Sequence, residues 1–420
     1  MLYDRWRQIA ARFHDQPALH DIASKRSWTF GQLFAAGEGW PSATGEIVYP
    51  QGHTPEFILT VLSAWRDGKV VCPLEPDAPA PQVPRPPAEC VHLKSTSATT
   101  AASRLVAFTA EQLSADVENI VATMGLRPDW PNLGIISMSH SYGFSNLVLP
   151  LLLHGLPLIL VPSGLPESLR RAAAGQKALV LPAVPALWQA WHEAGAIPGN
   201  IRLAISAGAH LPLSLEQAIF HSSGLKVHNC YGSTECGGIA FDRSDTPRSD
   251  EALVGTALCN VRLVVGDNGC LQIQGAAVGE TYWPSPSECL QAGRFQTGDL
   301  VEISDGAVFL RGRVTDFINV AGRKLSPSVL ERMLIDHPAV AACLVFGTPS
   351  PKPELGDQIV ACIVAHEPVT AGSLREFLSA KAPPWQIPKD WWFVDSLKPN
   401  RLGKISRSEW RARYLARRSH

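Results

Sequence analysis

A short polar run, Tyr231-Gly232-Ser233-Thr234-Glu235, combines the residue types that a nucleotide site needs. It follows an apolar, strand-like segment, residues 225–230, and precedes Gly237 and Gly238. A glutamate at such a strand-to-loop junction can hold Mg²⁺, because hard divalent cations prefer carboxylate oxygen and ATP arrives as its magnesium complex. The hydroxyl of Thr234 can donate to a phosphate beside it. For the pentapeptide alone a capped turn is the simpler interpretation. The choice between a capped turn and a nucleotide site therefore depends on the segments that follow.

A second acidic group follows in Thr297-Gly298-Asp299. A carboxylate at the end of a predicted strand can accept both hydroxyls of a ribose. Arg313, fourteen residues further on, adds a planar guanidinium that can donate to the ribose or to a phosphate edge. A turn aspartate and a surface ion pair are the alternatives when either residue is taken alone.

A lysine near the C-terminus completes the series. Lys404 ends the run Asn400-Arg401-Leu402-Gly403-Lys404, in which Gly403 permits a close approach of the backbone. Its ammonium can bridge a substrate carboxylate and an α-phosphate, where it would stabilise the charge that builds up as pyrophosphate leaves.

Taken in this order, the segments resemble the adenylate-forming superfamily of acyl-CoA synthetases, peptide-synthetase adenylation domains and luciferases. The resemblance extends from about residue 20 to residue 407. It implies that Thr234, Glu235 and Lys404 are catalytic, with Glu235 also holding the metal. It further implies a nucleotide site formed by Tyr231, Gly232, Ser233, Asp299 and Arg313, with Tyr231 at the adenine and Asp299 and Arg313 at the ribose.

The segment 312–316, Gly-Arg-Val-Thr-Asp, resembles the hinge about which the family's small domain rotates between adenylation and thiol transfer. Gly322, followed by Arg323 and Lys324, resembles the loop that later lines the thiol channel. Thr315 stands where the family commonly has a charged residue. Because a hinge needs tolerant backbone torsions more than a charge, we expect the pivot to work here.

One segment departs from the family pattern. The phosphate loop of the family is rich in Ser, Thr and Gly and ends in lysine, whereas here the glycine positions carry Ala98 and Ala101 and the basic position is Arg104. Alanine does not adopt positive φ cheaply, so the backbone cradle for pyrophosphate is altered. Either the loop works through its hydroxyls and Arg104 or its handling of ATP is weakened. The hydroxyls belong to Thr96, Ser97, Thr99 and Thr100.

For the acid substrate, residues 139–143 resemble the family segment that gates the acyl pocket. His140 is a candidate contact for the substrate carboxylate, and a structural, hydrogen-bonded histidine is the alternative. Small residues suit a flat aromatic ring or a linear acyl chain, and the sequence does not choose between them. The candidate acid-binding residues are His140, Tyr142, Ser206, Gly208, Gly237 and Gly238.

Bulk properties restrict the partners and the compartment. A formal net charge of -1 with 18% charged residues gives no electrostatic reason to expect nucleic acid or an anionic membrane. Nine cysteines without a repeated Cys-x-x-Cys pattern favour reduced thiols in the cytoplasm and argue against zinc. The N-terminus lacks the apolar core of a signal peptide. The most hydrophobic run, residues 147–161, is broken by Pro and Gly and is too short to span a bilayer.

Short apolar segments alternate with helix-like stretches, which predicts a layered α/β fold with mainly parallel sheets. The expected strands include residues 45–49, 134–138, 178–181 and 203–206, and the expected helices include residues 110–124 and 213–223. Beyond about residue 250, short alternating strands with glycine-containing turns predict a β-rich subdomain. We therefore expect a large multi-layer α/β domain over residues 1–311, and a small, mobile α+β lid domain over residues 312–420.

The sequence thus predicts an ATP- and Mg²⁺-dependent ligase that converts a small carboxylic acid, aryl or fatty, into an acyl-adenylate and passes the acyl group to a thiol. The thiol is either coenzyme A or the phosphopantetheine arm of an acyl carrier protein, which the arginines of residues 407–418 would then meet. An adenylate- or acyl-binding protein without turnover, disabled by its phosphate loop, is the alternative from another class.

Overall fold

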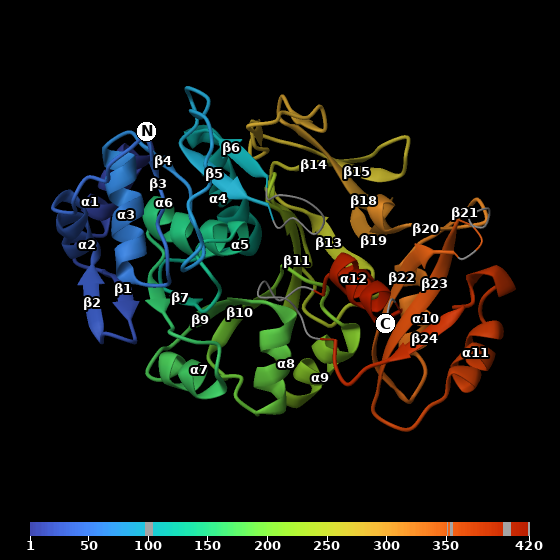
Figure 1. The fold of residues 1–420 in the computed structure, drawn as a ribbon. Coiled ribbons are helices and arrows are strands. Elements are labelled where there is room, and N and C mark those ends of the chain that lie inside the picture. The colour runs from blue at the N-terminus through green and yellow to red at the C-terminus, as the bar shows by residue number, and fades with distance from the viewer. Residues whose placement is uncertain (97–103, 351, 353–355, 398–404, 419–420) are drawn as a thin grey trace.

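The structure is a computed structural model that describes residues 1–96, 104–350, 352, 356–397 and 405–418. Figure 1 shows a large lobe, blue to yellow, and a smaller lobe in orange and red. The predicted α/β class, with a sheet-rich large N-terminal part and a small C-terminal part, is confirmed.

The largest sheet of the described residues has fourteen strands, and its centre is parallel. The block β1, β8, β7, β9, β10 and β11 is parallel throughout, and the sheet becomes antiparallel at the β1–β2 pair on one side and at the β11–β12 pair on the other. In spatial order the strands are β14 (Arg262–Val265), β15 (Cys270–Gln274), β18 (Arg294–Ser304), β19 (Ala307–Arg313), β13 (Leu253–Ala257), β12 (Gly237–Phe241), β11 (Val227–Ser233), β10 (Ile201–Ser206), β9 (Leu179–Ala183), β7 (Asn132–Gly134), β8 (Leu158–Leu160), β1 (Pro17–Asp21) and β2 (Arg26–Thr29), with β17 (Leu290–Gln291) beside β18.

A second sheet carries the two ends of the predicted phosphate loop. Its order is β16 (Thr281–Trp283), β6 (Leu105–Phe108), β5 (His92–Ser95), β4 (Val70–Val71) and β3 (Ile47–Val48). β5 and β6 are antiparallel, and Ser95 at the end of β5 is opposite Leu105 at the start of β6. The loop that joins them therefore starts and ends at the same end of these two neighbouring strands.

Helices pack against both sheets of the large lobe (Figure 1). Helix α4 begins with a capping box in which Thr109 accepts from the backbone of Gln112 and Gln112 accepts from the backbone of Thr109. It ends at Gly125, which adopts the left-handed conformation that favours glycine. The helices are α1 (Leu2–Arg12), α2 (Phe30–Glu38), α3 (Pro55–Arg66), α4 (Ala110–Met124), α5 (Ser141–Gly143), the π-helical turn η1 (Phe144–Val148), α6 (Leu149–His154), α7 (Pro166–Ala173), α8 (Pro185–Glu193) and α9 (Leu213–Ser223).

The smaller lobe has cores of its own. Two hydrophobic clusters run from Ile318 to Ile387 and from Leu344 to Tyr414, and neither contains a buried residue of the large lobe. Its β20–β21 hairpin turns through Ala321 and Gly322, with φ of 49° and 79°. The elements are η2 (Val314–Asp316), β20 (Ile318–Val320), β21 (Arg323–Leu325), α10 (Pro327–Ile335), β22 (Val340–Pro349), β23 (Asp357–Ala365), α11 (Ala371–Ser379), η4 (Pro384–Gln386), β24 (Asp390–Phe393) and α12 (Arg407–Arg418).

Most expected elements are present, and α4 and α9 have their predicted bounds. The strand expected over residues 134–138 is wrong: β7 ends at Gly134. Ile136 and Met138 are buried without strand pairing, so burial in the core explains their apolar character. The sequence predicts a strand over residues 301–303, and β18 is longer, extending back through Thr297 and Asp299. The β-rich part continues the central sheet by hydrogen bonds through β12.

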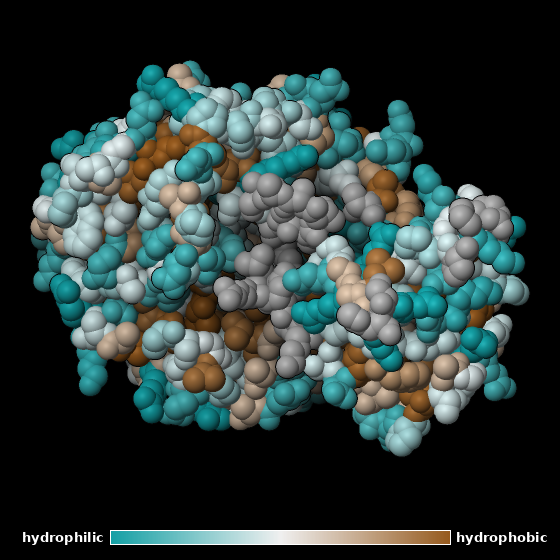
Figure 2. Space-filling model, in the orientation of Figure 1, coloured by the Kyte–Doolittle hydropathy of each residue, from teal (hydrophilic) through white to brown (hydrophobic). Residues whose placement is uncertain are grey.

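The surface is hydrophilic over most of the face in Figure 2. Hydrophobic residues gather in a recess near its centre, in the region where Figure 1 places β9 and β10. In the part of the chain that the structure describes, no helix is both long enough and apolar enough to cross a membrane.

Candidate active site

The turn between β11 and β12 carries the predicted catalytic pair Thr234 and Glu235. Ser233 is opposite Gly237 in the antiparallel register, so only three residues close the turn. Gly237 has a φ of 67°, in the left-handed region that side chains disfavour. The Oγ of Ser233 lies 3.2 Å from the Sγ of Cys236 and braces the turn from inside. The turn therefore presents Thr234 and Glu235 together at the end of a central strand.

Tyr231, Asp299 and Arg313 form one polar cluster. The hydroxyl of Tyr231 donates to Oδ2 of Asp299 at 2.5 Å, and Nε of Arg313 donates to Oδ1 at 2.6 Å. Burial and the Asp299 charge raise the pKa of Tyr231 well above its usual value, so its hydroxyl stays a donor. The charge of Asp299 raises the pKa of Arg313. The structure thus brings the predicted adenine and ribose residues into direct contact with one another.

Glu235 has two contacts that the sequence did not indicate. Its Oε1 accepts a hydrogen bond of 2.7 Å from the hydroxyl of Tyr282, and its backbone oxygen accepts one of 2.8 Å from the N–H of Gly279. Tyr282 lies in β16, beside the strand that leaves the phosphate loop. The glutamate is therefore held by a segment 44 to 47 residues away in sequence, which explains why no local pattern revealed the contact.

Thr96 and Arg104 close the stem of the phosphate loop. The N–H of Thr96 donates to the oxygen of Arg104 at 2.8 Å, and the N–H of Arg104 donates to Oγ1 of Thr96 at 3.2 Å. The guanidinium of Arg104 lies over the ring of Tyr282, 5.4 Å from its centre. The other predicted phosphate contacts, Ser97, Thr99 and Thr100, lie outside the described residues.

A buried ion pair lies beneath this region. Nζ of Lys94 is 3.4 Å from Oδ2 of Asp116, and both side chains are 2% exposed. Oγ of Ser145 donates to the same carboxylate oxygen at 2.5 Å, while the N–H of Gly238 donates to Oδ1 at 3.3 Å. Lys94 is two residues before Thr96, and Gly238 is three residues after Glu235. The pair therefore links the base of the phosphate loop to the β11–β12 turn, a contact between distant segments that sequence reasoning missed.

Asp116 also explains why Gly237 is glycine. A Cβ on Gly237 would come within 1.9 Å of Oδ1 of Asp116, and one on Gly238 would come within 2.4 Å of the Leu258 side chain. The space beside both glycines is thus filled by the protein itself. Their predicted contact with the acid substrate stays a prediction, and internal packing is sufficient to require them.

The predicted acid-binding residues lie in two groups. Nε2 of His140 is 3.2 Å from a carboxylate oxygen of Glu75, and Ser137 donates to the same oxygen at 2.5 Å. Glu75 follows Leu74 and was not anticipated, because no motif marks it. Its carboxylate contacts the imidazole through one ring nitrogen.

The second group lies at the carboxyl ends of the parallel strands. Tyr142 donates to the backbone oxygen of Ala183 at 3.4 Å, and Ala183 is paired with Ser206 in the β9–β10 register. Ser206 is fully buried, and its Oγ has no hydrogen-bond partner among the described residues. Gly208 is exposed two residues further on, with a φ of 83°. In open α/β sheets, ligands bind beyond the carboxyl ends of the strands, which is where this group lies.

The predicted hinge lies among the described residues, whereas the predicted catalytic lysine, Lys404, lies outside them. Gly322 is exposed at the tip of the β20–β21 hairpin, and a Cβ added there would meet no atom within 4 Å. Asp316, the last residue of the predicted hinge, accepts from Nη1 of Arg407 at 2.7 Å, and Nη2 of Arg407 donates to Glu331 at 2.6 Å. Helix α12 is thereby fastened to the hinge segment at its first residue.

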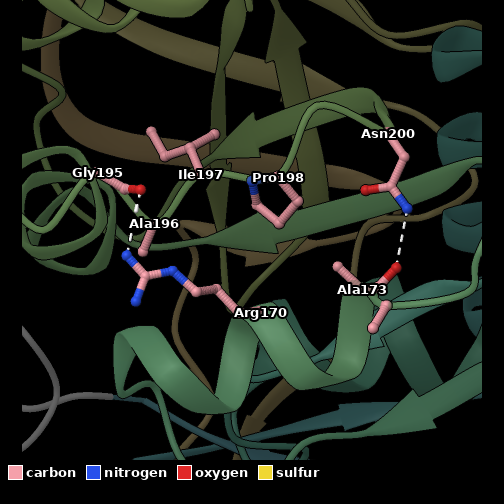
Figure 3. A pocket seen from close by; sticks show the side chains of 8 residues that line it. Arg170, Ala173, Gly195, Ala196, Ile197, Pro198 and Asn200 are labelled. Carbon is pink, nitrogen blue, oxygen red and sulfur yellow. Dashed lines mark hydrogen bonds between the residues drawn. The ribbon is translucent and has the colours of Figure 1, made fainter.

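A depression of about 230 Å³ lies away from these residues, between α7 and the segment after α8 (Figure 3). Its polar groups are already engaged: Arg170 donates to the backbone oxygens of Ala194 and Gly195, and Asn200 donates to those of Ala173 and Gln176. It contains none of the predicted chemical groups and is explained as a packing irregularity.

The side chains near Glu235 can be compared with what the predicted Mg²⁺ site needs. Among the described residues, no three His, Cys, Asp or Glu side chains group closely enough to hold a metal ion. Mg²⁺ in nucleotide enzymes commonly takes one or two carboxylates and completes its shell with water and phosphate oxygen. One half-buried carboxylate at the Glu235 turn therefore fits an ion that arrives with ATP and does not fit a resident metal.

Comparisons with known proteins agree with this geometry. The AMP-binding enzyme profile matches residues 75–287, and the AMP-binding enzyme C-terminal domain matches residues 329–404. A feruloyl-CoA synthase of Amycolatopsis sp. is 27% identical over 389 residues, covering 86% of this chain and 78% of the relative. A malonate–CoA ligase of Mus musculus is 27% identical over 246 residues, covering 50% and 42%. The crystal structure of ATP-bound MatB from Rhodopseudomonas palustris superimposes with a TM-score of 0.84 at 20% identity, covering 99% of each chain.

The chain belongs to the AMP-binding enzyme family, as its motifs predicted. The predicted class of activity, an adenylate-forming and AMP-forming acid–thiol ligase, is confirmed by this membership and by the ligases among its relatives.

Proposed function

We propose that this enzyme activates an aryl carboxylic acid with Mg-ATP and transfers the acyl group to coenzyme A. The observation that carries the proposal is the contact of Tyr231 and Arg313 with Asp299, next to the turn that bears Thr234 and Glu235. An aromatic ring, a carboxylate with its guanidinium partner, and a turn with a hydroxyl and a second carboxylate are groups suited to the adenine, the ribose and the phosphates of ATP. A relative named for feruloyl-CoA, matched over most of both chains, supports the choice of acid and thiol.

The reaction has two balanced steps. An oxygen of the acid attacks the α-phosphorus, the bond to the β-phosphate oxygen breaks, and pyrophosphate leaves. The thiolate then attacks the acyl carbon of the mixed anhydride, the bond between that carbon and the AMP oxygen breaks, and AMP leaves.

Each residue of the site has a role in these two reaction steps. Asp299 and Arg313 hold the ribose, Tyr231 packs against the adenine, and Thr234 donates to the α-phosphate. Bound at Glu235, Mg²⁺ would neutralise phosphate charge. Lys404 would hold the acid and the α-phosphate oxygens in line for attack, so it contributes both alignment and charge stabilisation. Gly232, Ser233, Gly322 and the hydroxyls of Thr96, Ser97, Thr99 and Thr100 complete the proposed contacts.

The pocket for the acid would lie where β9, β10 and β11 end. Ser206, Tyr142 and Gly208 gather there, and His140 stands at a second wall with Glu75 behind it. The mouse malonate–CoA ligase matches half of this chain, and a short dicarboxylic acid is therefore the comparison substrate in the test.

An acyl carrier protein as acceptor is a second candidate, favoured by one observation. Helix α12 exposes Arg411, Arg413 and Arg417, and these arginines would meet an acidic helix of a carrier protein through opposite charge. For the compartment we keep the cytoplasm as a proposal, supported by the nine cysteines, all of which lie among the described residues and none of which forms a disulfide.

The test measures AMP and pyrophosphate release from Mg-ATP with a panel of aryl, fatty and short dicarboxylic acids. We expect release with aryl acids and its loss in Lys404→Ala, whereas Lys389→Ala, an exposed lysine of the same lobe, keeps it. Lys404→Ala should still convert a synthetic acyl-adenylate to the thioester, because that step releases no pyrophosphate. ATP binding without release for any acid would favour the binding-protein alternative, and transfer only to a phosphopantetheine-bearing carrier would replace coenzyme A as acceptor.

A further inference from the structure

Tyr282 connects the two halves of the phosphate site. It lies on β16, which pairs antiparallel with β6, the strand that follows the phosphate loop, and it is 6% exposed. Its hydroxyl reaches across to Oε1 of Glu235 at 2.7 Å, and its ring lies 5.4 Å from the guanidinium carbon of Arg104. A single side chain therefore contacts the carboxylate of the β11–β12 turn and the basic residue of the loop.

The tyrosine is chemically suited to hold a metal-binding carboxylate. A carboxylate has two oxygens, so a donor on Oε1 fixes the orientation of the group and leaves Oε2 to face a cation. A phenol is a neutral donor, so Tyr282 holds the carboxylate without adding a charge beside the metal. A lysine in the same place would compete with the cation.

The ring provides the second function. A guanidinium within about 6 Å of an aromatic centre is attracted to its face. Arg104 is so placed at the end of the loop, where its backbone also closes the stem with Thr96. The loop carries Ala98 and Ala101 where the family pattern has glycine, and Arg104 is a basic side chain at its end that Tyr282 holds from outside the loop.

We propose that Tyr282 is a positioning residue for Mg-ATP, orienting Glu235 toward the metal through its hydroxyl and holding Arg104 toward the phosphates through its ring. The inference rests on the proposed function, because it assigns Glu235 to the metal and Arg104 to the phosphates.

The experiment separates hydroxyl from ring by calorimetry. Tyr282→Phe keeps the ring and its packing but removes the donor. We expect its dissociation constant for ATP to rise about tenfold in Mg²⁺ and to stay unchanged in EDTA, since loss of a partner of a metal ligand weakens metal affinity about 10- to 100-fold. Tyr414→Phe, which removes a hydroxyl from a carboxylate in the smaller lobe, is the matched control and should change neither value.

The ring is tested by Tyr282→Leu with Arg104→Met. Arg104→Met should weaken ATP binding in Mg²⁺ and in EDTA alike. Tyr282→Leu should weaken it in EDTA through loss of the ring, and further in Mg²⁺ because the hydroxyl is also gone. In EDTA the double variant should lose less than the product of the two single effects, because both disrupt one contact. Equal losses for Tyr282→Phe in Mg²⁺ and EDTA would overturn the assignment of the hydroxyl to the metal, as would no loss in either. A double-variant loss equal to the product of the single losses would overturn the role of the ring.

The proposed function is checked on the wild type alone. If the wild type releases pyrophosphate in an acid-dependent way while Tyr282→Phe binds Mg-ATP normally, the inference about Tyr282 fails and the function stands. If the wild type shows no tightening of ATP by Mg²⁺ and no release, both fail together.

Discussion

Asp299 and Arg313 stand directly opposite each other on β18 and β19, and Nε of Arg313 lies 2.6 Å from Oδ1 of Asp299. The guanidinium is 59% exposed and the carboxylate only 13% exposed, so the pair has an open side formed by the arginine. Tyr231 occupies the other carboxylate oxygen. Each oxygen keeps a second lone pair, so a ribose diol can be accepted without breaking either bond.

Removing the negative charge of Asp299 should therefore weaken nucleotide binding. We expect Asp299→Asn to raise the dissociation constant for ATP by about 10- to 100-fold, since a hydrogen bond to a charged group contributes about 1.5–3 kcal/mol. Glu302→Gln is the matched control, because Glu302 is an exposed carboxylate on the same strand, paired with Arg311. Equal affinities for the wild type and Asp299→Asn would remove Asp299 from the ribose site.

The buried pair of Lys94 and Asp116 should appear in stability. Lys94→Met leaves the carboxylate buried with only the Ser145 hydroxyl and the Gly238 N–H, so we expect a loss of about 3–5 kcal/mol in the free energy of unfolding. Asp116→Asn combined with Lys94→Met should recover part of that loss, because no unpaired charge then remains buried. Urea titration of the two single variants and the double variant measures the coupling, and strict additivity would show that the two groups do not interact.

The altered phosphate loop can be tested by restoring its glycines. Ala98 and Ala101 lie outside the described residues, and the loop ends are joined by Thr96 and Arg104. If the hydroxyls and Arg104 carry phosphate binding, Ala98→Gly with Ala101→Gly should change kcat/KM for ATP by only about twofold, the equivalent of about 0.5 kcal/mol. A rise of two orders of magnitude in steady-state assays would mean that the alanines impair the enzyme.

Acid should destabilise the protein through His154. Burial, with the nearby Arg5 charge, lowers the pKa of His154 to about 4, and its Nε2 lies 2.9 Å from Nη2 of Arg5. Above about pH 6.5 the imidazole is neutral in both folded and unfolded chains and has no effect. As the pH falls from there to about 4, only the unfolded chain takes up the proton, so stability decreases. Urea titrations at pH 7, 5.5 and 4.5 should show a smaller decrease in His154→Gln, and an unchanged slope would contradict this assignment.

Local patterns predicted much of the fold because they record burial. The bounds of α4 follow from a capping threonine, an apolar face and a terminal glycine, all within the helix itself. The same reasoning failed at residues 134–138, where the apolar residues Ile136 and Met138 are buried without belonging to a strand. Periodicity reports that a side chain is buried, and it does not report whether its backbone finds a neighbouring strand.

The sequence by itself determined the family, the class of reaction and the order of the motifs, because each motif is a short run whose residue types match one task. Through the family resemblance it also grouped Asp299 with Arg313 as ribose ligands, whereas their direct contact follows from the β18–β19 register. Only the tertiary structure decided that Lys94 meets Asp116, that Glu75 holds His140 and that Tyr282 holds Glu235. Those partners lie 22 to 65 residues apart on different elements, and a contact of that kind is set by how sheets and helices pack, which no local spacing records.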